Sequence, residues 1–276
     1  MPETHRTDRE PLPGVPCLLV GMVHLLPLPG SPRWGGSLDA IIERAMADAR
    51  SLEDGGFHAC LVENYGDAPF SRTRVDPATV AALAVVVAAV RRAVGIPVGV
   101  NVLKNDAQAA LAVAAATGAA FIRVNVHVGA VVADQGLIEG DAYATLRYRR
   151  LLGTDTRLFV DVGGKHAVPV APVELEQVAR DAAYRGLADA LVVSGVATGE
   201  PTPLVDVKRV RAAVPDRPIL VGSGVTPETV GDLLQVADGA IVGTWIKRDG
   251  RTTGPVDPTR VAALARAASA VRPAER

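Results

Sequence analysis

Pro218-Ile219-Leu220-Val221-Gly222-Ser223-Gly224 is a short apolar run that ends in a glycine turn, and Gly239-Ala240-Ile241-Val242-Gly243-Thr244 repeats this arrangement further along the chain. Such runs are typical of buried strands, and glycine lets backbone N–H groups approach a bound anion closely. The turns after the last two strands of a (β/α)8 barrel frequently form a phosphate site. The two stretches therefore predict such a barrel and such a site. The residues expected to bind phosphate are Gly222, Ser223, Gly224, Gly243 and Thr244.

The rest of the chain supports this prediction, because apolar runs of strand length alternate with helical stretches. The runs are rich in valine, leucine and isoleucine without clean alternation, as in parallel strands that are buried on both faces. We predict one α/β domain, a (β/α)8 barrel over residues 15–276, after a loose, proline-rich tail over residues 1–14. The expected strands are Leu18–His24, Ala59–Glu63, Val98–Val102, Phe121–Val126, Leu158–Val162, Ala190–Ser194, Ile219–Gly222 and Gly239–Gly243.

Residues that favour helix ends stand between these runs. Ser37 is expected to cap a helix over 38–53, and Asn105 or Asp106 to cap one that ends at Gly118. Thr226-Pro227-Glu228 and Asp257-Pro258 are expected to open the last two helices. The segment 127–140 is long for a barrel loop, so a lid, a subunit contact and a surface excursion all remain open.

Composition excludes several classes of protein. The chain has 276 residues, 49% of them hydrophobic, and a formal net charge of -1, so we expect no nucleic-acid partner. The longest apolar run, Val80–Val90, is too short to span a bilayer; it fits a helix buried within the chain or one covered by a second copy, and we expect a homo-oligomer. Cys17 and Cys60 lie in apolar runs without metal-ligand spacing, which fits a reducing cytoplasm and a cytoplasmic location.

Polar residues occur repeatedly where the expected strands end, which is the catalytic face of a barrel. Period-two spacing places Arg123, Asn125 and His127 on one side of their strand. The candidate catalytic residues are His24, Glu63, Asp161, Lys165 and His166. The candidate substrate-binding residues are Asn64, Asn101, Lys104, Arg123, Asn125 and Ser194.

The residue types leave several roles open. Asp161 and Lys165 fit an acid/base pair or a structural ion pair, and Lys165 also fits a Schiff-base amine. His24, Glu63 and Asp161 together have the chemistry to hold a divalent metal ion, although their spacing is not compact. Arg123 fits a clamp for an anionic substrate, or a buried ion pair with Glu63 or Asp161.

Several stretches together resemble the BtpA/SgcQ family: Gly21–Pro32, Val62–Phe70, Asn125–Ala130, Asp134–Gly136, Asp161–His166 and Val221–Val225. The resemblance covers nearly the whole chain beyond the tail and implies a TIM barrel. One branch of that family is named for photosystem I biogenesis, as a membrane-associated extrinsic protein, and another is linked with sugar-utilisation genes.

Two functions are therefore predicted. The first is an isomerase, lyase or hydrolase that acts on a small phosphorylated metabolite, a sugar phosphate or a nucleotide-like molecule, by acid/base catalysis at the strand ends. The alternative is a non-catalytic assembly factor that is associated with a membrane, as the resemblance implies.

Overall fold

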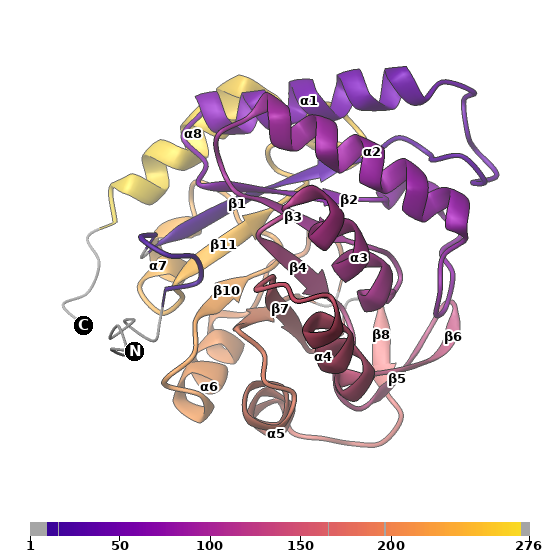
Figure 1. Ribbon diagram of the computed structural model, residues 1–276. Coiled ribbons are helices and arrows are strands. Elements are labelled where there is room, and N and C mark those ends of the chain that lie inside the picture. Colours follow the sequence, from indigo (N-terminus) through magenta and orange to yellow (C-terminus); the bar gives the residue numbers. More distant parts are fainter. Residues whose placement is uncertain (1–9, 16, 165, 196, 272–276) are drawn as a thin grey trace, which may run out of the picture.

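The computed structural model describes residues 10–15, 17–164, 166–195 and 197–271, so residues 1–9 of the expected tail and Lys165 lie outside it. Within the described residues, eight parallel strands close a barrel in the order β1–β2–β3–β4–β7–β9–β10–β11 (Figure 1). All eight expected strands are confirmed, two of them with the expected bounds and six with one end that differs by one or two residues. The barrel strands are β1 (Leu18–His24), β2 (Ala59–Glu63), β3 (Val98–Asn101), β4 (Phe121–Val124), β7 (Arg157–Val162), β9 (Ala190–Val193), β10 (Ile219–Val221) and β11 (Gly239–Val242).

Helices surround the barrel, and α8 packs against α1 to complete the outer layer (Figure 1). Ser37 and Asp106 accept hydrogen bonds from backbone N–H groups in the first turns of α1 and α3, as expected, and Asp257 caps α8. The α-helices are α1 (Leu38–Asp54), α2 (Pro77–Ala93), α3 (Ala107–Thr117), α4 (Ala142–Leu151), α5 (Leu175–Arg180), α6 (Leu204–Ala213), α7 (Val230–Leu234) and α8 (Pro258–Ser269). Shorter helical turns are η1 (Tyr65–Asp67), η2 (Asp181–Arg185) and η3 (Arg248–Gly250).

Helix α7 begins later than the sequence predicts. Residues 227–229 form a turn in which the Thr229 N–H donates to the Thr226 carbonyl oxygen, and the helix starts at Val230. This bond spans three residues and is tighter than the bond of an α-helix. The proline after Thr226 therefore opens a turn rather than the helix itself.

Aromatic stacking fills the interior of the barrel. The rings of Phe121 and Phe159 lie 4.5 Å apart between their centroids, and a Cβ atom at Gly99 would overlap the Phe121 ring. Leu12, which the sequence placed in the tail, is buried with this inner cluster, and the Arg157 side chain donates to the carbonyl oxygens of residues 10 and 11. This end of the expected tail is therefore packed against the barrel.

Helix α2, which contains the longest apolar run of the sequence, lies between α1 and α3. Six of the eleven residues in its run Val80–Val90, including Leu83, Val86 and Val90, are buried within the chain, while Val85 is 48% exposed. Burial inside one chain thus accounts for the composition of α2 without a second copy. The oligomeric state stays a prediction.

The long segment after β4 forms a hairpin rather than an irregular loop. Strands β5 (Ala130–Ala133) and β6 (Gly136–Glu139) pair in antiparallel fashion, and β8 (Ala167–Pro169) adds a third strand beside β5. The side chains of Leu137, Val132 and Val168 face one another across the three strands and are exposed. This small sheet therefore presents an apolar row at the surface.

Lys247 is fully buried and links strand β1 to helix α1. Its Nζ donates to the Met22 carbonyl oxygen at 2.7 Å and lies 3.5 Å from Asp48 Oδ2. Asp48 Oδ1 accepts from Arg44 Nε and from the Val256 N–H. Burial lowers the pKa of Lys247 to about 8, although the nearby Asp48 carboxylate acts in the opposite direction.

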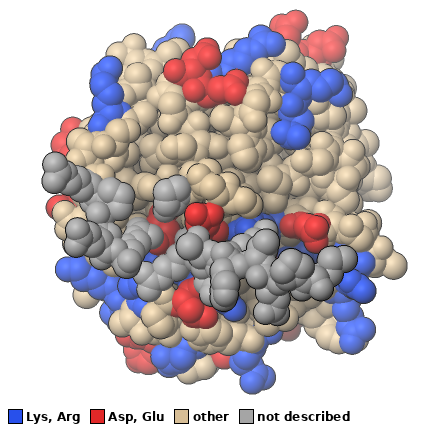
Figure 2. All heavy atoms as spheres, turned by 60° about the vertical axis from the view of Figure 1, so that its left-hand side comes forward, with Lys and Arg blue, Asp and Glu red and all other residues tan. Residues whose placement is uncertain are grey.

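Charged side chains of both signs are interspersed on the face in Figure 2, with uncharged surface between them. This arrangement agrees with the small net charge and gives this face no extended field of one sign. Over the described residues, none of the helices combines the length and the apolar character needed to cross a membrane.

Candidate active site

The carboxyl ends of the barrel strands carry a ring of inward-facing positions. Side chains alternate between the two faces of a strand, so the residue two places beyond an interior apolar residue also points inward. In the register of β1 to β4, His24 is level with Glu63, Glu63 with Asn101, and Asn101 with Arg123. The inward positions at the strand ends are His24, Glu63, Asn101, Arg123, Asp161, Ser194, Gly222 and Gly243. Six polar side chains and two glycines thus surround the mouth of the barrel.

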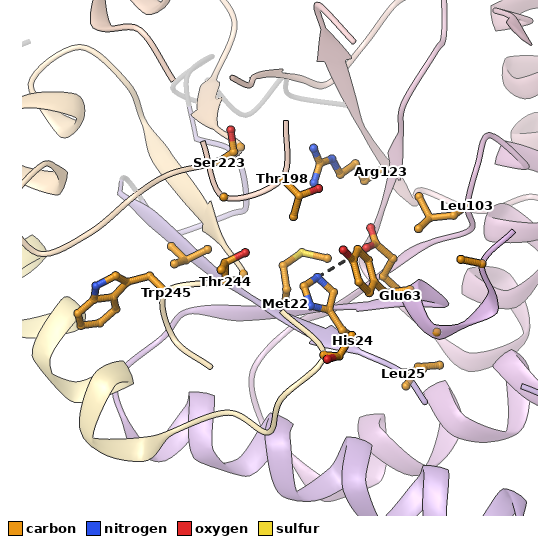
Figure 3. A pocket seen from close by; sticks show the side chains of 18 of the residues that line it. Met22, His24, Leu25, Glu63, Leu103, Arg123, Thr198, Ser223, Thr244 and Trp245 are labelled. Carbon is orange, nitrogen blue, oxygen red and sulfur yellow. Dashed lines mark ion pairs between the residues drawn. The ribbon is translucent and has the colours of Figure 1, made fainter. Parts of the chain in front are cut away.

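A cavity of about 620 Å³ opens above this ring, a size suited to a small metabolite. Ser223, Thr244 and Trp245 lie toward one side of it, His24 and Met22 near the middle, and Leu103 at the other side (Figure 3). The predicted residues that line it are His24, Glu63, Lys104, Arg123, Asn125, His166, Gly222, Ser223, Gly224, Gly243 and Thr244. Asn64, Asn101, Asp161 and Ser194 do not line the cavity.

His24 and Glu63 form a pair at the floor of the cavity (Figure 3). His24 Nδ1 lies 2.9 Å from the Thr252 carbonyl oxygen. Because a carbonyl can only accept, Nδ1 carries a proton, and Nε2 lies 3.6 Å from Glu63 Oε1. The other carboxylate oxygen of Glu63 accepts from Asn101 Nδ2 at 2.6 Å. The contact with Thr252 orients the His24 ring, and the contact with Asn101 orients the Glu63 carboxylate. A proton on Nε2 would therefore lie between the imidazole and the carboxylate.

Tyr65 is a residue of the site to which the sequence assigned no role. Its ring lies 4.6 Å from the His24 ring, and its hydroxyl group has side-chain hydrogen bonds with Thr198 and Thr252. Burial and then the negative charge of Glu63 raise the pKa of Tyr65, so the phenol stays protonated near neutral pH. The sequence feature that could have identified Tyr65 is its place two residues after Glu63, just beyond the end of a strand.

Arg123 and Asp161 form a buried ion pair, which is one of the alternatives that the sequence left open. Arg123 Nε and Nη2 donate to the two oxygens of Asp161 at 2.8 and 3.0 Å. Burial alone would lower the pKa of Arg123, but the Asp161 carboxylate outweighs it and the pKa is raised. Asn125 Nδ2 also donates to Asp161. The Asp161 carboxylate is therefore committed to these partners, and its pairing with Lys165, which lies outside the described residues, stays a prediction.

Other predicted residues support the mouth from outside the cavity. Asn64 accepts from the Leu103 N–H and donates to Asp67, so it joins the loops after β2 and β3. Ser194 Oγ is buried below Gly222, without a hydrogen-bond partner among the described residues. His166 Nε2 accepts from the Thr198 N–H at 3.3 Å at the cavity rim.

The prediction that His127 lies on the same side of its strand as Arg123 and Asn125 is wrong. The strand ends at Val124, so the alternation that aligns Arg123 and Asn125 does not continue to His127. Its ring is buried, and Nε2 lies 2.8 Å from the Gly186 carbonyl oxygen, away from the cavity. Burial lowers the pKa of His127.

The metal hypothesis gains no support from the geometry. Over the part of the chain that the structure describes, no three His, Cys, Asp or Glu side chains come together as a metal site would require. His24 and Glu63 are neighbours, but Asp161 is bonded to Arg123 and Asn125 instead. The three residues proposed as ligands thus do not fit one ion.

The two glycine turns form one wall of the cavity. Not all of the N–H groups expected to bind phosphate are available for a ligand. The Gly222 N–H donates to the Val193 carbonyl oxygen at 2.7 Å, so it is not directed at a ligand. Gly224 has φ +64°, and a Cβ atom there would overlap Pro201. In contrast, the N–H groups of Ser223, Gly224 and Thr244 have no acceptor among the described residues.

The hydroxyl groups of these turns already have protein partners. Ser223 Oγ accepts from the Gly195 N–H at 2.8 Å, and Thr244 Oγ1 lies 3.0 Å from Thr252 Oγ1. The donors left for a ligand are therefore the backbone N–H groups, beside the Arg260 side chain that also lines the cavity.

A closed ring of eight parallel strands with helices outside, and a cavity at the carboxyl ends of the strands, defines a TIM barrel. In overall shape it is similar to N-(5'-phosphoribosyl)anthranilate isomerase from Pyrococcus furiosus, with a TM-score of 0.55, 15% identity and coverage of 92% of this chain and 100% of that one.

The chain belongs to the BtpA family, whose model matches residues 17–270. It is 48% identical over 246 residues to the Photosystem I biogenesis protein BtpA of Synechocystis, which covers 89% of this chain and 86% of that protein. It is 33% identical to the putative sgc region protein SgcQ of Escherichia coli, over 88% of this chain and 91% of that protein.

Proposed function

We propose that this chain is an enzyme that binds a small phosphorylated metabolite and moves a proton on it. The observation that carries the proposal is the cavity at the carboxyl ends of the barrel, walled by both glycine turns and floored by the His24–Glu63 pair. Catalytic sites of TIM barrels lie at this end.

The phosphate would bind to the backbone N–H groups of Ser223, Gly224 and Thr244. These donors stand in neighbouring turns after β10 and β11, which pair directly in the barrel. N–H groups that converge in this way attract an anion without needing a charged side chain. The Arg260 side chain, at the start of α8, adds a positive charge to the same side of the cavity.

The proton would move through His24 Nε2, with Glu63 as its partner. Imidazole is suited to general acid/base work near neutral pH, and the bond from Nδ1 to Thr252 holds the ring in one tautomer. The protonated phenol of Tyr65 lies beside the His24 ring and would donate to a substrate oxygen. Isomerisation is the reaction class that this proton relay supports most directly, and aldol-type cleavage requires the same groups.

The comparisons support the substrate class through one printed name. The isomerase from Pyrococcus furiosus acts on a phosphoribosyl compound, as its name states, and shares the barrel. At 15% identity this likeness concerns the fold, so the substrate class of the present chain depends on its own cavity.

Titration with inorganic phosphate tests the site directly. In ¹H–¹⁵N spectra, we expect saturable shifts of the amide signals of Ser223, Gly224 and Thr244, because these N–H groups would donate to the anion. Gly118, at the opposite end of the barrel after α3, serves as the internal control. Shifts confined to other residues, or none, would refute the phosphate site.

Proton transfer is tested by deuterium exchange into phosphorylated sugars in D₂O, followed by NMR. A substrate that exchanges with the wild type should exchange about 10² to 10⁴ times more slowly with His24→Gln, since that variant lacks the proton-carrying group. Equal exchange rates would remove His24 from the mechanism.

A second candidate function is supported by the name of a relative and by one surface. The Synechocystis protein is named for photosystem I biogenesis, and the exposed row of Leu137, Val132 and Val168 would suit an assembly factor. The triple variant with serine at these positions should lose partner binding and keep phosphate binding. If phosphate causes no amide shifts while partner binding depends on the row, the assembly role is favoured.

A further inference from the structure

The cavity lining carries an excess of positive charge. Among the described lining residues, Arg33, Lys104, Arg123 and Arg260 are cations, whereas Glu63 is the sole carboxylate. Asp161 balances Arg123 from below the floor. The other three cations stand on two separate sides: Arg260 donates to the carbonyl oxygen of Trp245, directly after the second glycine turn, whereas Lys104 follows β3.

Strand order places these two sides opposite each other. Going around the barrel from β10, the neighbours are β11, β1, β2 and then β3, which is half of the ring of eight. With strands about 4.8 Å apart and tilted by about 36°, the ring is roughly 15 Å across. Lys104 follows β3 and lines the cavity, so it lies on the side of the mouth opposite the turn after β10.

Arg33 reinforces the Lys104 side. Its side chain donates from Nη2 to the Gly66 and Ala68 carbonyl oxygens at 3.4 and 3.2 Å, which holds the guanidinium over the loop after β2. Both residues line the cavity, and β2 pairs directly with β3. A guanidinium and an ammonium group at one edge form a site for a carboxylate or a phosphate.

We propose that the cavity takes a metabolite with an anionic group at each end: a phosphate at the glycine turns, and a second phosphate or a carboxylate at Arg33 and Lys104. The inference rests on the proposed phosphate site. Once the Lys104 side chain and the turn backbone are allowed for, the width of the mouth fits a chain of about five or six carbon atoms. Such a molecule lies over His24 and Glu63, between its two anchored ends.

Three ligands with the same carbon chain test this proposal by calorimetry at fixed ionic strength: glucitol 6-phosphate, 6-phosphogluconate and glucitol 1,6-bisphosphate. They differ only in the group at the second end, which is neutral, a carboxylate or a phosphate. At least one of the two-anion ligands should bind about 10-fold tighter than glucitol 6-phosphate, as expected for added charge-assisted hydrogen bonds. The tighter of the two identifies the second anion.

The double variant Arg33→Gln/Lys104→Gln should remove this advantage and leave the affinity for glucitol 6-phosphate within about threefold. The matched control Arg50→Gln/Arg92→Gln removes two arginines from α1 and α2, Arg50 exposed and Arg92 partly exposed. It should leave the affinities for all three ligands unchanged. If glucitol 6-phosphate binds and the second anion brings no advantage, or the advantage survives in the double variant, the inference is wrong while the phosphate site stands. If none of the three ligands binds, the phosphate site itself is refuted.

Discussion

The buried Lys247 makes the stability of the protein depend on pH in a direction that the structure fixes. The ordinary pKa of a lysine is 10.5, and burial lowers that of Lys247 to about 8. Between these values the unfolded chain binds a proton that the folded chain has released, so stability rises as pH increases from 8 to 10.5. Below pH 8 both states are protonated, and this group contributes no slope. At about 1.4 kcal/mol for each pH unit, the full effect is about 3 kcal/mol.

The variant Lys247→Met isolates this effect, because methionine fills a similar volume and does not titrate. The free energy of unfolding is measured in urea from pH 7.5 to 10.5 by the fluorescence of Trp34 and Trp245. The wild type should gain about 3 kcal/mol relative to the variant across this range. Other titrating groups, such as Cys60, are common to both proteins and cancel in the difference.

The matched control is Lys208→Met, which removes an exposed lysine from α6. Its unfolding curve should run parallel to that of the wild type. A constant difference between wild type and Lys247→Met from pH 7.5 to 10.5 would refute the reasoning, because the buried ammonium would then bind its proton as it does in the unfolded chain.

Three further predictions concern residues that the structure buries. Asp161→Asn leaves the Arg123 guanidinium buried without its counter-charge, so urea unfolding should show a loss of about 3–5 kcal/mol; a loss below about 1 kcal/mol would contradict a buried pair. Gly224→Ala should lose about 1–3 kcal/mol in the same assay, because φ is +64° and the added Cβ meets Pro201, whereas an unchanged stability would show that the turn relaxes freely. Burial raises the pKa of Cys60 to about 12, so iodoacetamide should not alkylate Cys60 in the native protein at pH 8. Mass spectrometry detects the alkylation, and rapid labelling of Cys60 would contradict this prediction.

The strands could be predicted from the sequence because each one is a short valine- and leucine-rich run that the barrel buries on both faces. The partner of Arg123 could not be chosen, because the choice depends on strand order. Strand β3 stands between β2 and β4, and its Asn101 donates a hydrogen bond to one oxygen of Glu63. Strand β7 lies directly beside β4, which places Asp161 within hydrogen-bond distance of Arg123.

Long-range burial was equally invisible in the sequence. The residues next to Lys247 in the sequence do not indicate that its ammonium group lies beside Asp48. Asp48 belongs to a helix near the other end of the sequence. The error at His127 has a local cause: the period-two pattern holds only while the strand continues, and β4 stops at Val124.

The order of the strands also relates the two proposed anion sites to the proposed chemistry. Strand β1 stands between β11, which precedes one glycine turn, and β2, which pairs with the strand before Lys104. His24 ends β1, so it lies on the path between a phosphate at the turns and a second anion at Lys104. A ligand anchored at both ends would therefore bring its middle carbons to His24 and Glu63, whereas a ligand anchored at one end would be free to swing away from them. On this argument, loss of the Lys104 anchor should slow proton exchange more than it weakens binding of the phosphate end.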